Sequence, residues 1–210
     1  TKQYRNIEKN DFISNHINFE APTEDNKQIK DKILDFIYSI QESKENGDFL
    51  LKVLSSSLFG NKYEKLYNGK GVLFSLLEDT LDNYFNQSSS QFLTSKYRAG
   101  SPNPSLFNCN KKRIVVVNEP EENEGDNNLK FNLAFLKKIT ANDTVECRDL
   151  FKSNIKFRCN FTTFIQCNQI PNIEKIDQAV KRRFVIIDFP YNFVDEPVFD
   201  NQKQRDNTLK

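Results

Sequence analysis

The sequence is poor in the residues that build a metal centre or a disulfide framework. It has 4 cysteines, 1 histidine, no methionine and no tryptophan. No two cysteines form a C-x-x-C pair and only His16 could add an imidazole ligand, so a zinc site is disfavoured. Buried free thiols in a reducing compartment explain the cysteines better.

Long apolar runs and an excess of one charge are also absent. No segment is apolar over a length that would cross a bilayer or act as a secretory signal, which predicts a soluble, intracellular protein without a membrane partner. The formal net charge is +1, so any binding of nucleic acid has to come from local basic patches. Because the chain begins at Thr1 without an initiating methionine, we expect it to be a piece of something longer.

What is present suffices for one α/β domain, or for one domain with a small appendage. The chain has 210 residues, of which 37% are hydrophobic and 28% charged, a mixture typical of globular domains with a sizeable core. Residues 88–105 are rich in turn-forming types and predict a mobile loop. The acidic stretch at 121–128 predicts a solvated loop.

Periodicity predicts the regular elements. Apolar residues at helical spacing predict helices over 26–40, 48–60, 71–85 and 129–140. Apolar, β-branched runs predict strands over 113–122, 143–151, 155–168 and 183–189. The first helix should bury one face, made of Ile29, Ile33, Phe36, Ile37 and Ile40. The alternation of strands and helices predicts an α/β fold with a mainly parallel sheet.

The stretch "LYNGKG" at residues 66–71 is similar to the end of a phosphate-binding loop, G-x-x-x-x-G-K-[ST]. In such a loop backbone amides hold the phosphates, the lysine reaches the β/γ-phosphates and the hydroxyl holds Mg²⁺. Gly69 and Lys70 match, whereas Glu64 stands at the first glycine and Gly71 at the hydroxyl. A buried strand should precede the loop, but "NKYEKLY" is too polar for one. Taken alone, the stretch is explained at least as well by a turn before a helix.

Three further positions follow in the order of one NTPase. Glu119 comes after "IVVV", where a carboxylate can polarise water and assist a metal. Asn168 ends a later strand, where an amide can orient the attacking water. Arg182 and Arg183 precede the last strand, where an arginine can reach a neighbour's phosphate. Each has an ordinary explanation: a charged loop, a turn, a solvated basic pair. Their order along the chain is stronger than any one of them.

From about residue 10 to 200 the chain resembles the helicase half of the primase-helicases of large DNA viruses, phages and plasmids. These are superfamily 3 helicases of the poxvirus primase-helicase type. The stretches that carry the resemblance are "LYNGKGVLFSLLEDTLDNYF", "KRIVVVNEPEE", "LKKITANDTVECRDLFKSNIKFRCNFTTFIQCNQIP" and "DQAVKRRFVIIDFPYNFVDEP". The family implies a P-loop NTPase core of AAA+ type, with ATP and Mg²⁺ as cofactors. It also implies movement on single-stranded or forked DNA by a homo-oligomeric, hexameric ring, within viral or plasmid replication machinery in the host cell.

The resemblance assigns the nucleotide loop as follows. Lys70 matches the phosphate-binding lysine, and Asn68 with Gly69 matches its lead-in. The family places a strand, a glycine-rich turn and then N-G-K-[ST] here. In this chain the strand and first glycines are missing, as if residues had been removed between Tyr67 and Asn68, and Gly71 replaces the hydroxyl. These departures predict impaired ATP binding if the chain is a degenerate copy or a fragment. If the sequence instead omits a segment, the loop itself could be whole.

The remaining roles also come from the resemblance. Glu119 matches the Walker B catalytic glutamate, which assists Mg²⁺ indirectly, and Asn168 matches the sensor amide. One of Arg182 and Arg183 resembles the arginine finger, and the sequence does not choose between them. The stretch "KKITANDTVECRDLF" resembles the part that shapes the pore-side hairpin. Candidate DNA contacts there are Lys138, Arg148, Lys152 and Lys156.

The sequence thus predicts a helical lead-in at 1–58, an AAA+ core at 59–200, and the start of a truncated C-terminal segment at 201–210. Its function is predicted as an ATP-dependent DNA helicase, impaired in ATP binding, whose full-length form could also carry a primase domain. The alternative is a non-catalytic DNA-binding or ring-assembly module that keeps the AAA+ scaffold. A small kinase is disfavoured, because no acceptor-binding motif or lid is recognisable.

Overall fold

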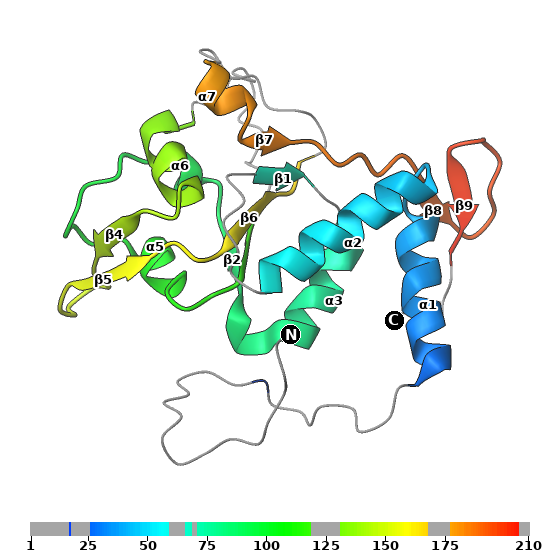
Figure 1. Ribbon diagram of the computed structural model, residues 1–210, viewed down its shortest axis with the longest axis horizontal. Coiled ribbons are helices and arrows are strands. Elements are labelled where there is room, and N and C mark those ends of the chain that lie inside the picture. Colours follow the sequence, from blue (N-terminus) through cyan, green and yellow to red (C-terminus); the bar gives the residue numbers. More distant parts are fainter. Residues whose placement is uncertain are drawn as a thin grey trace, which may run out of the picture.

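A five-stranded parallel sheet forms the centre of the computed structural model, which describes residues 17, 26–58, 66–68, 71–118, 131–167 and 177–205 (Figure 1). The sheet order is β2-β3-β6-β1-β7. Its strands are β1 Leu66–Asn68, β2 Phe85–Ser88, β3 Ile114–Val117, β6 Thr162–Ile165 and β7 Phe184–Val185. Two strand pairs lie outside it: β4 Thr144–Cys147 with β5 Ile155–Arg158, and β8 Asn192–Val194 with β9 Gln202–Gln204.

The helices lie on both faces of this sheet. They are α1 Lys27–Ser39, α2 Lys44–Leu58, α3 Gly71–Leu81, α4 Gln91–Thr94, α5 Pro104–Asn108, α6 Leu133–Thr140 and α7 Gln178–Lys181, with a 3₁₀ turn at Asp82–Tyr84. Asn26, Asn103 and Asn132 cap α1, α5 and α6, each accepting a hydrogen bond from a backbone amide of the first turn. Such caps satisfy amides that a helix start leaves unpaired.

Alternate residues of β3 face two separate cores. Ile114 and Val116 pack with α1, α2 and α3, whereas Val115 and Val117 pack with α4, α5 and α6. All four β3 residues are buried, as expected of a parallel strand covered on both sides. The result is three layers, with helices α1 to α3 on one face and α4 to α6 on the other (Figure 1). The predicted α/β fold with a mainly parallel sheet is confirmed.

The expectation that the strand before the loop is missing is wrong. β1 lies between β6 and β7, with Leu66 opposite both Thr163 and Phe184. It is only three residues long, so its neighbours rather than its own composition hold it in the sheet. Pairing on both sides satisfies backbone groups in a stretch that is too polar to be recognised by its side chains.

Three smaller predictions also fail. The third helix ends at Leu81 and Phe85 begins β2, so the apolar residue at 85 belongs to a strand. The predicted loop at 88–105 is ordered: it holds the end of β2, α4 and the start of α5, and buries Phe92 and Leu93. The predicted strand 155–168 is two strands, β5 and β6.

On α1 only the C-terminal part of the predicted face is buried. Ile37 and Ile40 lie in the core, whereas Ile29 and Ile33 are 55% and 46% exposed. Because α1 shares a core with α2, α3 and the sheet, the boundary at residue 58 between lead-in and core stays a prediction. The predicted acidic loop at 121–128 lies outside the described residues.

Candidate functional site

Three neighbouring strands end side by side at one edge of the sheet. Ile165, the last residue of β6, is opposite both Val117, the last of β3, and Asn68, the last of β1. The residues that follow these strands therefore leave the sheet at the same level. We call this edge the strand-end site and define it as the segments that directly follow β1, β3 and β6.

The predicted nucleotide residues belong to these segments. Gly69 and Lys70 stand between β1 and α3, and Gly71 is the first residue of α3. Glu119 comes two residues after β3, and Asn168 comes three residues after β6. Gly69, Lys70, Glu119 and Asn168 lie outside the described residues, so the structure gives the strands that carry them and not their side chains.

The sheet order makes the strand-end site a topological switch point. From β1 the chain crosses to β2, the outermost strand on one side of the sheet, whereas from β6 it passes to β7, the outermost strand on the other side. Connections that leave in opposite directions open a crevice at the carboxyl ends of the strands, where ligands of open α/β sheets usually bind. Helix α3 starts three residues after the last residue of β1, so its unpaired amides and the positive end of its dipole lie close to the strand-end site.

Hydrogen bonds fix the edge near β3. The Gln87 side chain donates to Asn118 Oδ1 over 2.8 Å, and the Asn118 amide donates to the Ser88 carbonyl over 3.0 Å. The Gln166 amide donates to the Val117 carbonyl over 2.9 Å. The first two bonds hold Asn118, the residue immediately before Glu119, and the third holds Val117. Sequence reasoning missed Gln87, because nothing in its neighbourhood marks β2 as a strand of this sheet.

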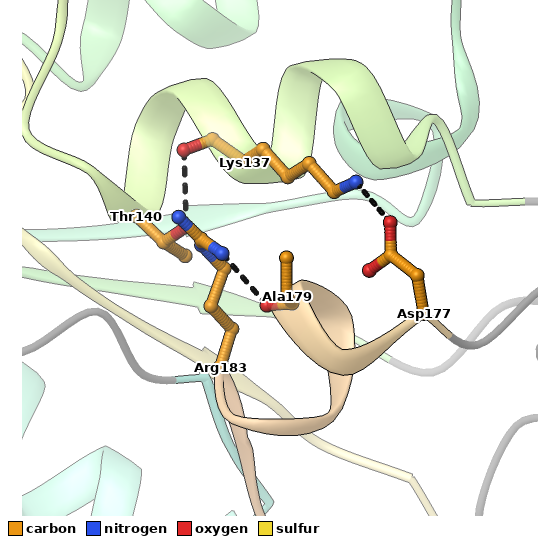
Figure 2. Close-up of polar contacts among 5 residues, drawn as sticks. All are labelled: Lys137, Thr140, Asp177, Ala179 and Arg183. Carbon is orange, nitrogen blue, oxygen red and sulfur yellow. Dashed lines mark hydrogen bonds and ion pairs between the residues drawn. The ribbon is translucent and has the colours of Figure 1, made fainter.

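The structure separates the two candidate arginines. Arg183 Nε donates to Thr140 Oγ1 over 3.2 Å and its Nη1 donates to the Ala179 carbonyl over 2.7 Å (Figure 2). Arg183 is 9% exposed, whereas Arg182 is exposed and its side chain makes no hydrogen bond or ion pair within the described part of the chain. Arg183 is thus committed to its own domain, and Arg182 is available to solvent or to a neighbour.

A second contact joins the same elements. Lys137 Nζ on α6 lies 2.6 Å from Asp177 Oδ2, just before α7 (Figure 2). With the Arg183 bonds it forms what we call the α6–α7 clamp, made of Lys137, Thr140, Asp177, Ala179 and Arg183. The clamp links the helix that leads into β4 to the segment that follows Asn168.

The four predicted DNA contacts lie on or beside an antiparallel hairpin. Strands β4 and β5 pair with Glu146 opposite Lys156, and residues 148–154 connect them at the margin of the molecule (Figure 1). Ile155 and Phe157 pack against the core, whereas Lys156 and Arg158 alternate with them on the exposed face. The stretch at 137–151, which resembles the part that shapes the pore-side hairpin, contains β4 and the start of the connection to β5; its position at a pore stays a prediction.

Three of these cations have partners in the chain itself. Lys152 Nζ lies 2.9 Å from Asp149 and 5.1 Å from the Phe107 ring centroid. Lys156 Nζ lies 3.3 Å from Glu146, and Lys138 Nζ lies 5.8 Å from the Tyr97 ring centroid. Arg148 and Arg158 have no side-chain partner among the described residues. Sequence reasoning did not select Arg158, although its alternation with Phe157 placed it on the outer face.

Cys109, Cys147 and Cys159 lie together in one core. Burial raises the pKa of Cys147 to about 11 and that of Cys159 to about 12, and it raises the pKa of Cys109 further. These thiols are therefore protonated at neutral pH and unsuited to bind a metal. Among the described residues there is no group of three His, Cys, Asp or Glu side chains that could hold a metal ion.

No helix in the described ranges is long and apolar enough to span a bilayer. No protein-family model matches the chain.

Curated viral proteins match most of the chain. It is 31% identical over 180 residues to "Putative helicase L207/L206" of Acanthamoeba polyphaga mimivirus, an alignment that covers 81% of this chain and 18% of that protein. It is 28% identical over 160 residues to "Primase D5" of Fowlpox virus, covering 73% of this chain and 20% of that protein. The chain thus spans about a fifth of the length of these relatives.

A solved structure shares the fold. The apo structure of the NrS-1 C-terminal region superposes with a TM-score of 0.55 at 18% identity, covering 80% of this chain and 39% of that one. At this identity the likeness concerns the fold alone, and it agrees with a P-loop NTPase-like core.

Proposed function

Since the chain belongs to the viral primase-helicase family, we propose that it is the nucleotide-binding part of an ATP-driven DNA helicase acting in viral DNA replication in the host cell. The observation that carries this proposal is the common level at which β1, β3 and β6 end. The segments that directly follow these strands carry Lys70, Glu119 and Asn168 in the sequence, which supports a shared site for a phosphate-binding loop, a carboxylate and an amide. These are the parts that phosphoryl transfer to water requires.

Each part has a distinct task. Backbone amides from Asn68 to Gly71 and the Lys70 ammonium would bind the phosphates of ATP, helped by the start of α3. Glu119 would assist Mg²⁺ and take the proton of the attacking water, and Asn168 would orient that water. Mg²⁺, when bound, would supply positive charge that neutralises the phosphates.

Arg182 is the better candidate for the arginine finger. Its exposure leaves the guanidinium free to reach a phosphate held by an adjacent subunit of a ring. Arg183, buried against α6, would hold the segment that presents Arg182. A homo-oligomeric ring and an attached primase domain belong to this proposal as implications of the family.

The hairpin is the proposed contact with single-stranded or forked DNA. Arg148 and Arg158 are open to phosphates, whereas Lys138, Lys152 and Lys156 would have to exchange their internal partners for them. Since the whole chain carries a net charge of only +1, this local arrangement rather than the overall charge would attract DNA.

The test is calorimetric titration of the chain with Mg-ATP. Wild type should bind saturably, and Lys70→Ala should lose binding by about tenfold or more, because one charge-assisted contact contributes about 1.5–3 kcal/mol. Lys32→Ala, which changes an exposed lysine of α1, is the matched control and should bind as wild type. Absence of binding by folded wild type at millimolar ATP would contradict the proposal.

One feature favours the second function, a non-catalytic module that joins a ring without hydrolysing ATP. Gly71, the first residue of α3, has no hydroxyl for Mg²⁺. Gly71→Ser separates the two functions. Mg²⁺-dependent hydrolysis that appears or rises several-fold in this variant indicates an impaired motor, whereas ATP binding with no hydrolysis in either form indicates the scaffold module.

A further inference from the structure

The connection between β4 and β5 ends in a fully exposed aromatic ring. Phe151 is 101% exposed and Leu150 beside it is 56% exposed. Phe151 also has a positive φ of 60°, a conformation that usually selects Gly or Asn. Neither burial nor backbone preference therefore explains a phenylalanine at this position.

The rest of the connection is held in place, so the ring stands on a fixed base. The Asn103 amide donates to the Arg148 carbonyl over 2.9 Å, and the Leu150 amide donates to Asp149 Oδ1 over 2.9 Å. Lys152 is tied to Asp149 and lies over the Phe107 ring. An exposed aromatic on an ordered turn loses little conformational freedom when a partner covers it.

Charge around Phe151 indicates the kind of partner. The segment 144–158 contains four basic and two acidic side chains, so its net charge is +2, whereas the net charge of the whole chain is +1. Both carboxylates are paired, Glu146 with Lys156 and Asp149 with Lys152. The two cations of this segment without a side-chain partner are Arg148, which directly follows β4, and Arg158, which ends β5 opposite Thr144. An exposed ring on the same hairpin as two unpaired cations suits a polyanion that offers flat apolar surfaces and extends along the hairpin.

Single-stranded nucleic acid has that chemistry, because its bases are unpaired and their faces can stack on aromatic side chains while phosphates meet cations. A duplex hides its base faces, and a basic hairpin would repel a second copy of itself. We propose that Phe151 is a base-stacking residue, with Arg148 and Arg158 contacting the flanking phosphates. This rests on the proposed DNA contact of the hairpin, and it is independent of ATP hydrolysis.

The absence of tryptophan from the chain allows a direct test. In Phe151→Trp the new indole is the only one present, and its fluorescence should be quenched on titration with a 20-mer of oligothymidine. A duplex of the same length should quench it much less. Trp at the same exposed position also keeps the stacking surface, so the affinity of this variant should stay near that of wild type.

Affinity measured by anisotropy of a labelled oligothymidine completes the experiment. Phe151→Ala should bind about tenfold to a hundredfold more weakly, as expected when one base–aromatic stack is removed, with an unchanged dependence on salt. Phe151→Leu, which stays apolar without an aromatic face, should lose affinity as well. Arg158→Ala should instead reduce the slope of log affinity against log salt by about one.

Several results would overturn the inference. Wild-type affinity in Phe151→Ala, with a loss in Arg158→Ala, would mean that the hairpin binds phosphates without stacking. If raising the protein concentration without DNA quenches the fluorescence of Phe151→Trp, the ring is instead a contact between copies of this chain. Wild-type affinity in both variants would remove the hairpin from the DNA site altogether. Stacking without Mg-ATP binding would leave this inference standing and the proposed nucleotide site rejected.

Discussion

The surroundings of single residues explain why three cysteines and one arginine take no part in the proposed chemistry. Cys109, Cys147 and Cys159 fill a dry core, where burial favours the neutral thiol. Arg183 is buried with hydrogen bonds to Thr140 and Ala179, while its sequence neighbour Arg182 is exposed. Two adjacent, chemically identical side chains thus differ in burial, and the difference depends on the elements that pack beside them.

The buried thiols predict a loss of stability at high pH. The ordinary thiol pKa is 9.0, and in the folded chain the pKa of Cys147 is about 11 and that of Cys159 about 12. Above pH 9 the unfolded chain loses protons that the folded chain retains, so the free energy of unfolding should fall, by at most about 1.4 kcal/mol per thiol for each pH unit.

Urea unfolding at pH 8, 9 and 10 checks this. The matched variant is Cys147→Ala with Cys159→Ala, whose level of stability will differ but whose slope against pH should be flatter than that of wild type. Identical slopes would contradict the assignment of the effect to these thiols, since the lysines that also titrate there are common to both proteins.

At the scale of elements, the α6–α7 clamp should show that burial, not distance, sets the strength of an ion contact. Lys137 and Asp177 meet at 2.6 Å but keep side-chain exposures of 37% and 55%, so Lys137→Ala should cost less than about 1 kcal/mol. Arg183→Ala removes a buried, doubly bonded guanidinium and should cost about 2–4 kcal/mol.

Denaturant midpoints of the two variants, with unchanged m-values, measure these costs. Equal midpoints would mean that Arg183 contributes no more than an exposed surface pair. Arg182→Ala, the matched control one residue away, should leave the midpoint within about 0.5 kcal/mol of wild type.

The same scale shows which elements the sequence could predict. β3 could be predicted because four consecutive β-branched residues are typical of a strand that is buried on both faces. β1 was not, because its three residues gain their place from β6 and β7 rather than from their own side chains. β2 was hidden because Phe85 continues a helical spacing, and α4 because Phe92 and Leu93 stand among serines.

At the scale of the whole molecule, the order of the strands turns separate signals into one site. The sequence places Lys70, Glu119 and Asn168 in the right succession, but their succession does not say that β1 lies beside β6 and that β6 lies beside β3. Only the register, with Asn68 and Val117 both level with Ile165, brings the three segments to one edge. The proposed function depends on that adjacency.

The last strand of the described chain also contacts the end of the first helix. Lys203 in β9 donates to the Ser39 carbonyl at the end of α1 over 2.7 Å and lies 3.4 Å from the Tyr191 ring centroid. This contact fastens the last strand pair to the first helix. This contact lies away from the strand-end site and stabilises the fold.

The most direct test of the central claim is hydrogen–deuterium exchange with and without Mg-ATP. If β1, β3 and β6 end in one nucleotide site, peptides that cover 68–73, 117–121 and 165–170 should all exchange more slowly with the ligand, and Lys70→Ala should abolish the three effects together. Slower exchange at one of these segments alone, or only at peptides of α1 and α2, would contradict a shared site at this edge of the sheet.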